Sequence, residues 1–575
     1  IMRELIAKLR ENDIYISLEN GNLKLKFDGA EIPQSILEEI KSNKEEVVKY
    51  LKKNLKSTNN ASIKKAPELE SYPLSSSQYR FWILNQFEGM GQAYNMPSAV
   101  KLTGVVDADK FEDSFRLLIE RHEILRTCFK TNSEKEVRQY ILRTSDVNFE
   151  IAKKDFSTVE NQEEKVSDYL HELNSAPFNL EVPPLFRASL VMLGKNEYVF
   201  FLSVHHIIAD GWSIQLLITE VVKIYNSLTQ GKTAILPELT IQYKDYAVWL
   251  TTAEQQEKQQ ASEAYWLEQF KGELPILALP GSKPRPLIQT YNGASVTHQL
   301  AKGFLERLKQ FSREQDVTLF MTVLAGINVL LNKYTGQEDI IIGTPIAGRE
   351  HPDLENQLGL YLNTLAIRTS IEKHFSFFDL VKHEKQFLLG AYEHQSYPFA
   401  NLVGKLNFKR DTSRSALFDV MMDIKNQSQI ISNEELKNLE VKNYEFENKT
   451  SKNDLNFAFF ETDELVLSIE YNTDIYDKQF IEQMFGHFEN LLMRLIQHPE
   501  VPICELSYLT KEEEHQLLRG FNDTAVTYPN GLTLIDLFSV QVAKTPRDVA
   551  VQFANATLTY EELDKLSNQL AHCLK

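Results

Sequence analysis

The chain has 575 residues, of which 43% are hydrophobic and 25% are charged, and its formal net charge is −18. One hydrophobic core does not support that length, so we expect about three or four domains. The acidic balance argues against a nucleic-acid partner, because phosphate contacts require a basic face. Three distant cysteines without a CxxC pair argue against a disulfide framework or a structural zinc site and favour a reducing cytoplasm. We expect no membrane segment, since no apolar run approaches the roughly 18 residues that span a bilayer.

Residues 1–55 have the pattern of a small separate module with the order αββαα. Two alternating runs, Ile14 to Leu18 and Leu23 to Phe27, flank an Asn-Gly pair and predict a β-hairpin. In the second run the apolar side chains share one face, and Lys24 and Lys26 share the other. These lysines either protect an exposed sheet edge or receive an added partner strand of acidic character.

The order and size of this module resemble the TubC type of N-terminal docking domain, found at the start of nonribosomal peptide synthetase subunits. The resemblance implies that the hairpin side receives a short C-terminal segment of the preceding subunit, with Lys24 and Lys26 as docking residues. Residues 56–70 follow this module. They are polar and lack periodicity, which predicts a linker.

Residues 71–250 alternate densely between helix and strand patterns, and we interpret them as one lobe. Aromatic-rich helices are predicted near Tyr72–Trp82, where a serine stands near the N-cap, and at Tyr243–Trp249. A further helix is predicted between Val105 and Arg126. Each aromatic side chain, taken singly, is expected to pack in a core.

The main polar feature of this lobe stands where a buried strand, Tyr198 to Val204, gives way to a helix. His205 and His206 end the strand, and Ser213 is predicted to cap the helix that follows. Successive strand residues point to opposite faces, so only one imidazole can face a given cavity, and the other must have a supporting role. The alternative is that both are core histidines bonded to backbone groups.

Residues 251–505 predict a second lobe, which begins with a polar and then proline-rich crossover at residues 254–286. Strand and helix patterns alternate again, which favours two α/β lobes with a cleft between them. The predicted elements are the strands Ala294–Leu300, Asp339–Gly343 and Leu365–Arg368 and the helices through Phe304–Phe311 and Phe320–Leu331.

His205 to Gly211 match the HHxxxDG signature of condensation domains of nonribosomal peptide synthetases. Other segments resemble the remaining motifs of that family, in the family's order, over about residues 70–505. They are the Pro-Leu-Ser-Ser-Ser-Gln stretch from Pro73, Arg121–Thr127, Tyr243–Trp249, Gly343–Arg349 with Asn363-Thr364, His394–Phe399 and Arg414–Val420. The resemblance implies an α/β (α+β) fold, a pseudo-dimer of two chloramphenicol-acetyltransferase-like lobes with a tunnel between them.

The same resemblance implies an acyltransferase that forms peptide bonds in antibiotic or other secondary-metabolite biosynthesis. A donor carrier protein presents an acyl or peptidyl thioester, and an acceptor carrier protein presents an aminoacyl thioester, each on a 4′-phosphopantetheine arm. The domain itself is then expected to bind no cofactor and no metal. Its expected partners are these two carriers and the upstream subunit, in the cytoplasm, with no nucleic acid and no membrane.

Within the signature, His206 is expected to accept the amine proton, to orient the amine or to stabilise the tetrahedral oxyanion. His205 is expected to pack beside it or orient it. Gly211 is expected to let the backbone approach the substrate closely, with its N–H available to the oxyanion.

Asp210 lies in a buried context, and a buried carboxylate needs a cation or several hydrogen-bond donors. Arg349 and Arg126 are the candidate cations, and we prefer Arg349. Asp210 is therefore expected to be structural. Asn363 either lines the tunnel or simply packs within the fold.

The nearest rival function is epimerisation, because epimerisation domains share HHxxxDG. They usually follow a carrier domain, whereas this lobe pair follows a docking module. A heterocyclisation domain would carry a DxxxxD pattern in place of the two histidines. A catalytically silent carrier-docking platform is a third reading, which the intact signature disfavours. A metal hydrolase is least expected, since adjacent strand residues diverge and no carboxylate stands at a familiar ligand spacing.

The last part of the chain carries a further resemblance. Residues 506–524 resemble the linker into an adenylation domain, and residues 525–575 resemble the opening segment of that domain. The segments that carry this resemblance are Leu506–Thr510, Phe521–Thr524, Leu534–Phe538, Thr545-Pro546, Val549–Val551 and Leu558–Leu563.

Overall fold

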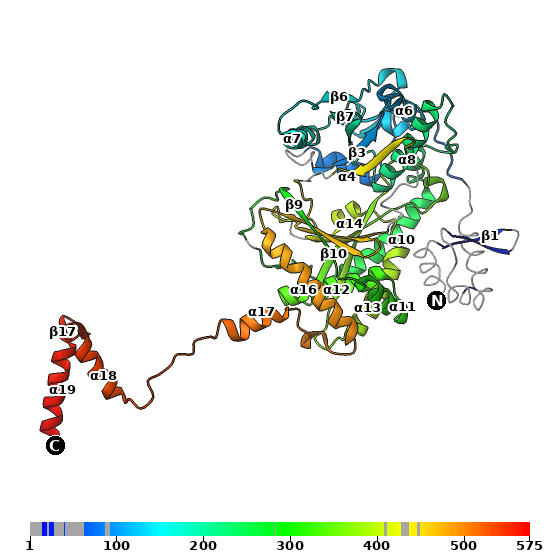
Figure 1. Cartoon of the computed structure of the whole chain (residues 1–575). Helices are drawn as coiled ribbons and strands as arrows, with labels where there is room; N and C mark the ends of the chain where they lie inside the picture. The colour runs from blue at the N-terminus through cyan, green and yellow to red at the C-terminus, as the bar shows by residue number, and fades with distance from the viewer. Residues whose placement is uncertain are drawn as a thin grey trace. The chain divides into compact units, whose positions relative to one another are not determined.

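The computed structural model describes residues 14–19, 22–27, 40, 62–86, 93–281, 283–406, 411–426, 436–444 and 449–575, with backbone alone for the first two ranges. The chain divides into two compact units, Ile1–Leu509 and Thr510–Lys575. The HHxxxDG segment belongs to the first unit, whose two helix-covered sheets are visible in Figure 1.

The predicted N-terminal hairpin is confirmed. β1 (Ile14–Glu19) and β2 (Asn22–Phe27) pair antiparallel in a two-stranded sheet. Lys24 stands opposite Ser17, and Lys26 stands opposite Tyr15. The helices predicted around this hairpin and its Asn-Gly turn lie outside the described residues.

The first lobe is built on a five-stranded sheet in the order β13-β3-β8-β7-β6. Along β8, Phe200 and Leu202 pack in the core that α6 and α8 share, whereas Val199 and Phe201 pack with α7. Because both faces of β8 are covered, the strand is a continuous apolar run, as predicted. The strands are β3 (Asn95–Gly104), β6 (Ala152–Asp155), β7 (Phe186–Gly194), β8 (Glu197–His205) and β13 (Leu439–Asn443). The main helices are α4 (Ser76–Leu84), α6 (Ala108–Arg121), α7 (Gln162–Ser175), α8 (Gly211–Thr229) and α9 (Tyr243–Trp249).

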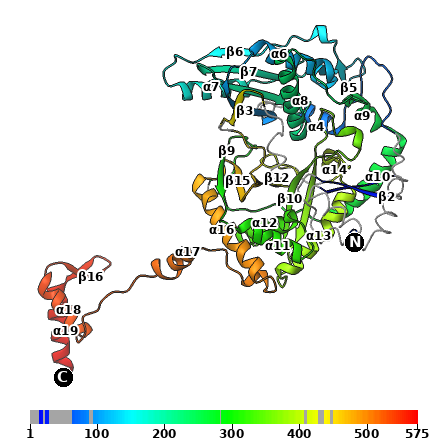
Figure 2. The same cartoon turned by 45° about the vertical axis from the view of Figure 1, so that its right-hand side comes forward.

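The second lobe is built on a six-stranded sheet in the order β11-β10-β12-β14-β15-β9, whose members β10, β12 and β15 are labelled in Figure 2. The strands are β9 (Gly293–Gln299), β10 (Asp339–Ile346), β11 (Asn363–Ser370), β12 (Val420–Asn426), β14 (Leu455–Glu461) and β15 (Leu465–Asn472). The main helices are α10 (Ala253–Gln269), α11 (Phe304–Glu314), α12 (Leu319–Thr335), α13 (Phe377–Glu393), α14 (Phe399–Lys405) and α16 (Lys478–Gln497). The predicted strands and helices of this lobe are therefore present. Their bounds are longer than predicted, except for β9, which keeps the predicted length and is shifted by one residue toward the N-terminus.

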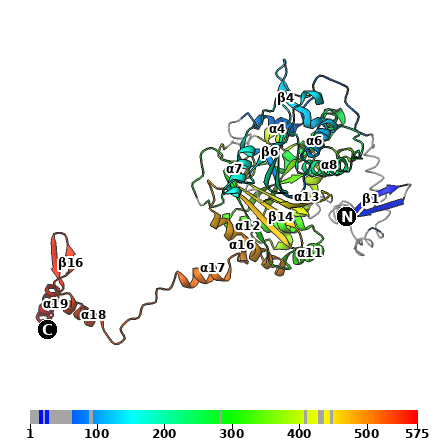
Figure 3. The ribbon, with the colours of Figure 1, turned by 45° about the horizontal axis from the view of Figure 1, so that its top comes forward.

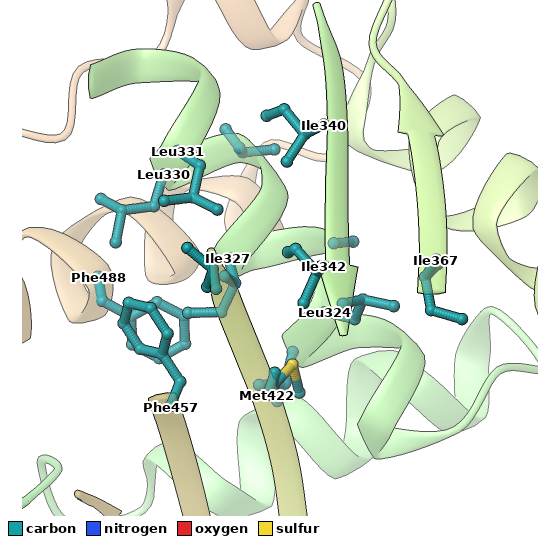
Figure 4. Packing of buried hydrophobic residues seen from close by; sticks show 14 of the residues in the cluster. Leu324, Ile327, Leu330, Leu331, Ile340, Ile342, Ile367, Met422, Phe457 and Phe488 are labelled. Carbon is teal, nitrogen blue, oxygen red and sulfur yellow. The ribbon is translucent and has the colours of Figure 1, made fainter. Parts of the chain in front are cut away.

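Helix α12, labelled in Figure 3, packs its side chains into the second lobe's core, as Figure 4 shows. Its side chains Leu324 and Ile327 pack toward Ile342 of β10, with Phe457 of β14 beside them. Gly326 lets α16 approach, since a Cβ there would lie 2.8 Å from a methyl carbon of Leu492. No single helix among the described residues is long and apolar enough to cross a membrane, although α11 and α12 pass that test as a bent pair.

The first lobe contains segments from the second half of the chain. β13 follows β12 in sequence, yet it pairs antiparallel with β3 of the first lobe's sheet. Leu358, Leu360 and Tyr361, which precede β11, are buried in the first lobe's core. The first lobe therefore depends on chain from the second half of the sequence.

Two stretches predicted as connections contain more structure than their composition indicates. Helix α10 occupies the first half of the predicted crossover and buries Trp266 in the second lobe's core. Residues 62–70 form no helix or strand, but Ile63 is buried in the first lobe's core, and its N–H donates to Asp353 at 2.9 Å. A single apolar residue in a polar stretch is too sparse a pattern to predict such docking.

The second unit contains three helices and one hairpin. They are α17 (Lys511–His515), α18 (Leu534–Lys544), β16 (Val549–Phe553), β17 (Ala556–Thr559) and α19 (Tyr560–Leu574), with a π-helical turn at Gln516–Gly520. Large apolar side chains of this unit are exposed, among them Leu534, Phe553 and Leu574.

Glu384 on α13 gives the second lobe a stability that depends on pH. It is buried and accepts a hydrogen bond of 2.7 Å from Asn328 of α12. Burial raises its pKa to about 8, which the hydrogen bonds from Asn328 and Thr369 only partly oppose. Because the pKa of Glu384 is higher in the folded than in the unfolded protein, the folded protein binds this proton more tightly. The free energy of unfolding therefore falls as the pH rises from the pKa of the unfolded state toward about 8.

We expect Glu384→Gln to remove most of this fall. One pKa unit corresponds to about 1.4 kcal/mol, so the free energy of unfolding of wild type should fall by a few kcal/mol over this pH range. Urea unfolding at acidic, neutral and mildly alkaline pH measures it, with Glu306→Gln as a control at a side chain that is 71% exposed. An equally steep fall in wild type and Glu384→Gln would contradict the expectation.

Candidate functional site

The two histidines lie at the end of β8, next to both of its neighbouring strands. The N–H of His205 donates to the carbonyl of Leu185 at 2.9 Å, and the N–H of His206 donates to the carbonyl of Tyr94 at 3.0 Å. Alternation along β8 continues to this point. His205 therefore has an interior position, whereas His206 lines a cavity.

His205 is fully buried and bonds to its own loop. Its Nδ1 accepts the N–H of Ile207 at 3.1 Å, and its ring meets the edge of Phe178 with 5.9 Å between centroids. Burial lowers its pKa to about 3, and the nearby His206 adds to the effect. A neutral ring whose nitrogen accepts a backbone N–H stabilises the turn after β8.

His206 lies against α4 and stays neutral. Its ring stacks on Phe81 with 4.9 Å between centroids and 13° between planes. Burial lowers its pKa to about 3, and the positive charge of Lys452 lowers it further. Above that pH the imidazole is neutral, so it can accept a hydrogen bond or a proton from an amine, but the charged form is disfavoured.

Asp210 caps α8, and this corrects the prediction for Ser213. The Oδ1 atom of Asp210 accepts the N–H of Ser213 at 2.8 Å, so Asp210 is the N-cap and Ser213 lies in the first turn. Its Oδ2 atom accepts the N–H groups of Tyr361 and Leu362 at 3.0 and 3.2 Å. The carboxylate is 1% exposed and therefore joins α8 to the segment before β11.

Arg349 is the cation beside this carboxylate. Its Nη2 lies 3.3 Å from Oδ1 of Asp210 and donates to Oγ of Ser213 at 2.9 Å. Its guanidinium also lies 4.2 Å from the ring centroid of Tyr361. Arg126, the other candidate, lies elsewhere and donates to the carbonyl of Leu142 at 3.0 Å.

Gly211 and Asn363 occupy different surroundings. Gly211 begins α8, is exposed, and has open space where a Cβ would stand, and it is not among the residues that line the cavity of His206. Asn363 lines that cavity, but its side chain is held by the backbone. Its Nδ2 donates to Gln395 at 2.8 Å and Tyr397 at 2.7 Å, and its Oδ1 accepts from Phe399 at 3.1 Å.

The cavity that His206 lines has a volume of about 1460 Å³. Single ligand pockets are typically about 300 to 1,000 Å³, so this one has room for more than one small substrate. Both lobes contribute to its wall, with Phe81, Tyr94 and His206 from the first and Asn363, Phe399 and Lys452 from the second.

Among the charged groups in this wall that sequence reasoning missed, two lie on the second lobe's sheet or next to it. Lys452 precedes β14 and Glu470 lies on β15, and both line the cavity. Burial raises the pKa of Glu470 and lowers that of Lys452. In the sequence Lys452 is a polar residue just before one alternating strand, and Glu470 is a polar residue within another. Residues on a solvent-exposed face show the same pattern. Within the described residues, no three His, Cys, Asp or Glu side chains form a group that could hold a metal ion.

Comparison with known families identifies the chain. The model of the condensation domain matches residues 68–518, and the model of the TubC N-terminal docking domain matches residues 2–53. The chain belongs to the condensation-domain family. It contains a docking domain followed by a condensation domain of the nonribosomal peptide synthetase type. Condensation domains of this type form peptide bonds by acyl transfer.

Curated relatives of this condensation domain are large synthetases. Gramicidin S synthase 2 of Aneurinibacillus migulanus is 38% identical over 579 aligned residues, which cover 99% of this chain and 13% of the relative. Tyrocidine synthase 3 of Brevibacillus parabrevis is 40% identical over 548 residues, covering 95% of this chain and 8% of the relative. The chain thus spans about an eighth of the first of these relatives and less of the second.

Solved structures share the fold of this condensation domain. A four-domain nonribosomal peptide synthetase, holo-AB3403 bound to AMP and glycine, matches with a TM-score of 0.75 and 24% identity, over 88% of this chain and 39% of that one. The X-domain in its complex with OxyB from teicoplanin biosynthesis matches with a TM-score of 0.71 and 23% identity, over 78% of this chain and 98% of that one. At these identities the likeness shows the mixed α/β fold.

We expect Asp210→Ala to act mainly on stability. It leaves the buried charge of Arg349 without its carboxylate partner and several buried N–H groups without their acceptor, and removing one partner of a buried pair costs about 3–5 kcal/mol. Asp107→Ala is the matched control, because Asp107 caps α6 through the N–H of Lys110 but its side chain is 42% exposed. Loss of that cap alone is worth about 1 kcal/mol.

Thermal and urea unfolding of the two variants measure the difference. An Asp210→Ala protein that unfolds like wild type yet makes no product would show that Asp210 acts in the chemistry instead.

Proposed function

We propose that this condensation domain joins a donor acyl or peptidyl thioester to an acceptor aminoacyl thioester, both held on carrier proteins. The observation that carries the proposal is a neutral imidazole, His206, in a cavity walled by both lobes. A cavity of about 1460 Å³ has room for two small substrates at once. We further propose that it is a tunnel between two chloramphenicol-acetyltransferase-like lobes, and that the phosphopantetheine arms enter at its mouths.

In the proposed step the acceptor amine attacks the donor carbonyl and His206 orients it. The nitrogen lone pair forms the new C–N bond, and the carbonyl π pair moves to oxygen. When the carbonyl re-forms, the C–S bond breaks and the donor thiolate leaves. The amine proton passes by way of His206 to that thiolate, so the catalyst returns to its starting state. Asp210 and Arg349 act by fixing the start of α8, and we assign no chemical step to His205, Gly211 or Asn363.

We expect His206→Ala to lower condensation by at least about 100-fold, the lower range for a positioned proton acceptor. Carriers loaded with each proteinogenic amino acid serve as acceptors, and N-acetylated aminoacyl carriers serve as donors, with mass spectrometry of the products. His298→Ala, an exposed imidazole on β9, is the control for loss of a histidine. Near-normal product from His206→Ala would remove His206 from the chemistry. Deuterium uptake at the acyl α-carbon without a new amide would instead show epimerisation, and neither reaction would show a silent platform.

The pH profile gives a separate test of the neutral imidazole. Because the pKa of His206 is about 3, kcat should show no acid limb near the ordinary histidine value. The rate at low acceptor concentration should rise with pH instead, since a free α-amine has a pKa of about 8. An acid limb of kcat at about 6.5 that disappears in His206→Gln would contradict this prediction.

We propose that the N-terminal module docks the C-terminal segment of an upstream subunit along β2. Among the described residues β2 pairs with β1 alone, which leaves its other edge for an added strand, and Lys24 and Lys26 would attract an acidic segment there. Reversing both charges with Lys24→Glu and Lys26→Glu should weaken binding of an acidic C-terminal peptide at least about tenfold, and added salt should weaken the wild-type complex. Lys52→Glu and Lys53→Glu are the controls outside β2. Equal loss in both double variants, measured by calorimetry, would refute a site on β2.

We also propose that residues 525–575 open an adenylation domain, after a linker at 506–524. The exposed apolar side chains of α18, β16 and α19 support this, because faces of that kind mark surfaces that pack against further structure. The matching domain bounds are 1–55 for docking, 56–70 for a linker, and 71–250 and 251–505 for the two lobes. The cytoplasm is the proposed location, which three free cysteines support.

A further inference from the structure

Lys452 is a charged group in the cavity to which the proposed mechanism gives no role. It stands between the backbone bridge of Asn292 with Thr450 and the start of β14, so the second lobe's sheet fixes its backbone. Its side chain lines the cavity that holds His206. The first lobe therefore supplies the imidazole to this space, and the second lobe supplies an ammonium group.

Aromatic contacts connect the two groups. The Nζ of Lys452 lies 5.4 Å from the ring centroid of Tyr94. The Tyr94 ring meets Phe81 edge-on with 4.9 Å between centroids, and Phe81 stacks on His206. The carbonyl of Tyr94 accepts the N–H of His206 at 3.0 Å. The ammonium thus contacts the residue that positions the imidazole, and its charge is felt at His206 as a lowered pKa.

Among the described residues, Lys452 has no ion-pair partner to neutralise its charge. No carboxylate of a described residue lies within 4.0 Å of its Nζ, although Glu470 of β15 is near enough to favour the charged form. Arg80, a second cation in the same wall, opposes that form and lies over Phe399 instead of a carboxylate. Burial is the largest effect, and it lowers the pKa of Lys452.

An ammonium that is partly buried and has no ion-pair partner among the described residues costs free energy in the resting protein. The cost falls when a negative charge forms beside it. Fixed charges aimed at a developing anion in a water-poor site are strong catalysts, because they need no reorganisation during the reaction. In amide formation from a thioester, the carbonyl oxygen is the atom that becomes negative, and it lies within one bond of the carbon that the amine attacks.

We propose that Lys452 is a catalytic residue whose ammonium stabilises the oxyanion of the tetrahedral intermediate. The proposal rests on the condensation reaction proposed above and adds an assignment of its negative oxygen. As the C–N bond forms, the π pair moves to this oxygen and lies beside the ammonium. When the C–S bond breaks, the pair returns to the carbonyl, so Lys452 gains and loses no proton. Gly211 is then not needed as the oxyanion donor, in agreement with its place outside the cavity lining.

The test compares Lys452→Met and Lys452→Arg with wild type, using the carrier pair from the panel above that gives most product. We expect Lys452→Met to lower kcat about 10²- to 10³-fold, the loss typical of one oxyanion donor, with the acceptor KM changed less than about threefold. Lys452→Arg keeps the charge and should restore kcat to within about tenfold of wild type. Lys309→Met is the matched control, since it removes a lysine of the same lobe that pairs with Glu461 at 2.8 Å outside the cavity lining.

Several results would overturn the assignment. One is a Lys452→Met protein with nearly normal kcat. Another is a change confined to KM, or a loss seen only with acidic amino acids, because either would make Lys452 a substrate-binding group. A third is equal loss in Lys452→Arg and Lys452→Met with a lowered melting temperature, which would make it structural.

A measurement without substrate separates this assignment from the proposed function. Reductive ¹³C-methylation and NMR, with Lys452→Arg to assign the signal, report the protonation of Lys452 in the resting protein. A charged amine at neutral pH supports the assignment, and a neutral amine overturns it even if wild type condenses. Wild type that is folded but forms no amide with any pair counts against the proposed function, and the assignment falls with it.

Discussion

The buried carboxylate of Asp210 is the constraint on which the geometry of the site depends. A carboxylate at 1% exposure is tolerated only where donors surround it, and here they come from two parts of the chain. The N–H of Ser213 belongs to the start of α8, and those of Tyr361 and Leu362 belong to the segment before β11. Because His206 lies four residues before Asp210, fixing the carboxylate also fixes the loop that carries the imidazole.

The segment that reaches Asp210 is itself held from the other side. Arg349 donates to the carbonyls of Leu354 and Gln357 as well as to Ser213. Gly348 has a φ of +65°, and a Cβ there would lie 2.0 Å from the carbonyl oxygen of Tyr361, so only glycine permits this close return of the chain. The loop, the carboxylate and the helix therefore form one rigid support beneath a cavity that must hold two substrates.

The sequence-based predictions that succeeded rest on patterns within a single helix, strand or hairpin. The hairpin at β1 and β2, the buried strand β8 and the helices α9 and α12 all follow from periodicity, because burial imposes period on the side chains of regular elements. The pairing of a cation with Asp210 could be reasoned from the cost of burying a charge. The sequence favoured Arg349 over Arg126 as this cation, and the structure was needed to confirm it.

The features that the sequence did not reveal depend on backbone geometry or on contacts between distant residues. Ser213 and Asp210 are both good N-cap residues, and only the backbone decided between them. Ile63 docks through one side chain, which has no periodicity. Lys452 looks like a solvent-facing residue, and it enters the cavity only because β14 and β15 place it there. Physical reasoning on the sequence can thus find the reactive loop, but the opposite wall comes from the tertiary fold.

The pairing of β13 with the first lobe's sheet limits how the cavity can open. Its five residues share an antiparallel ladder with β3, from Leu439 opposite Gly104 to Asn443 opposite Val100. Parting the lobes would expose these backbone groups, and each unpaired group carries a cost. An opening of the cavity that keeps this ladder intact must therefore leave β13 paired with β3, so the two lobes stay joined along these five residue pairs.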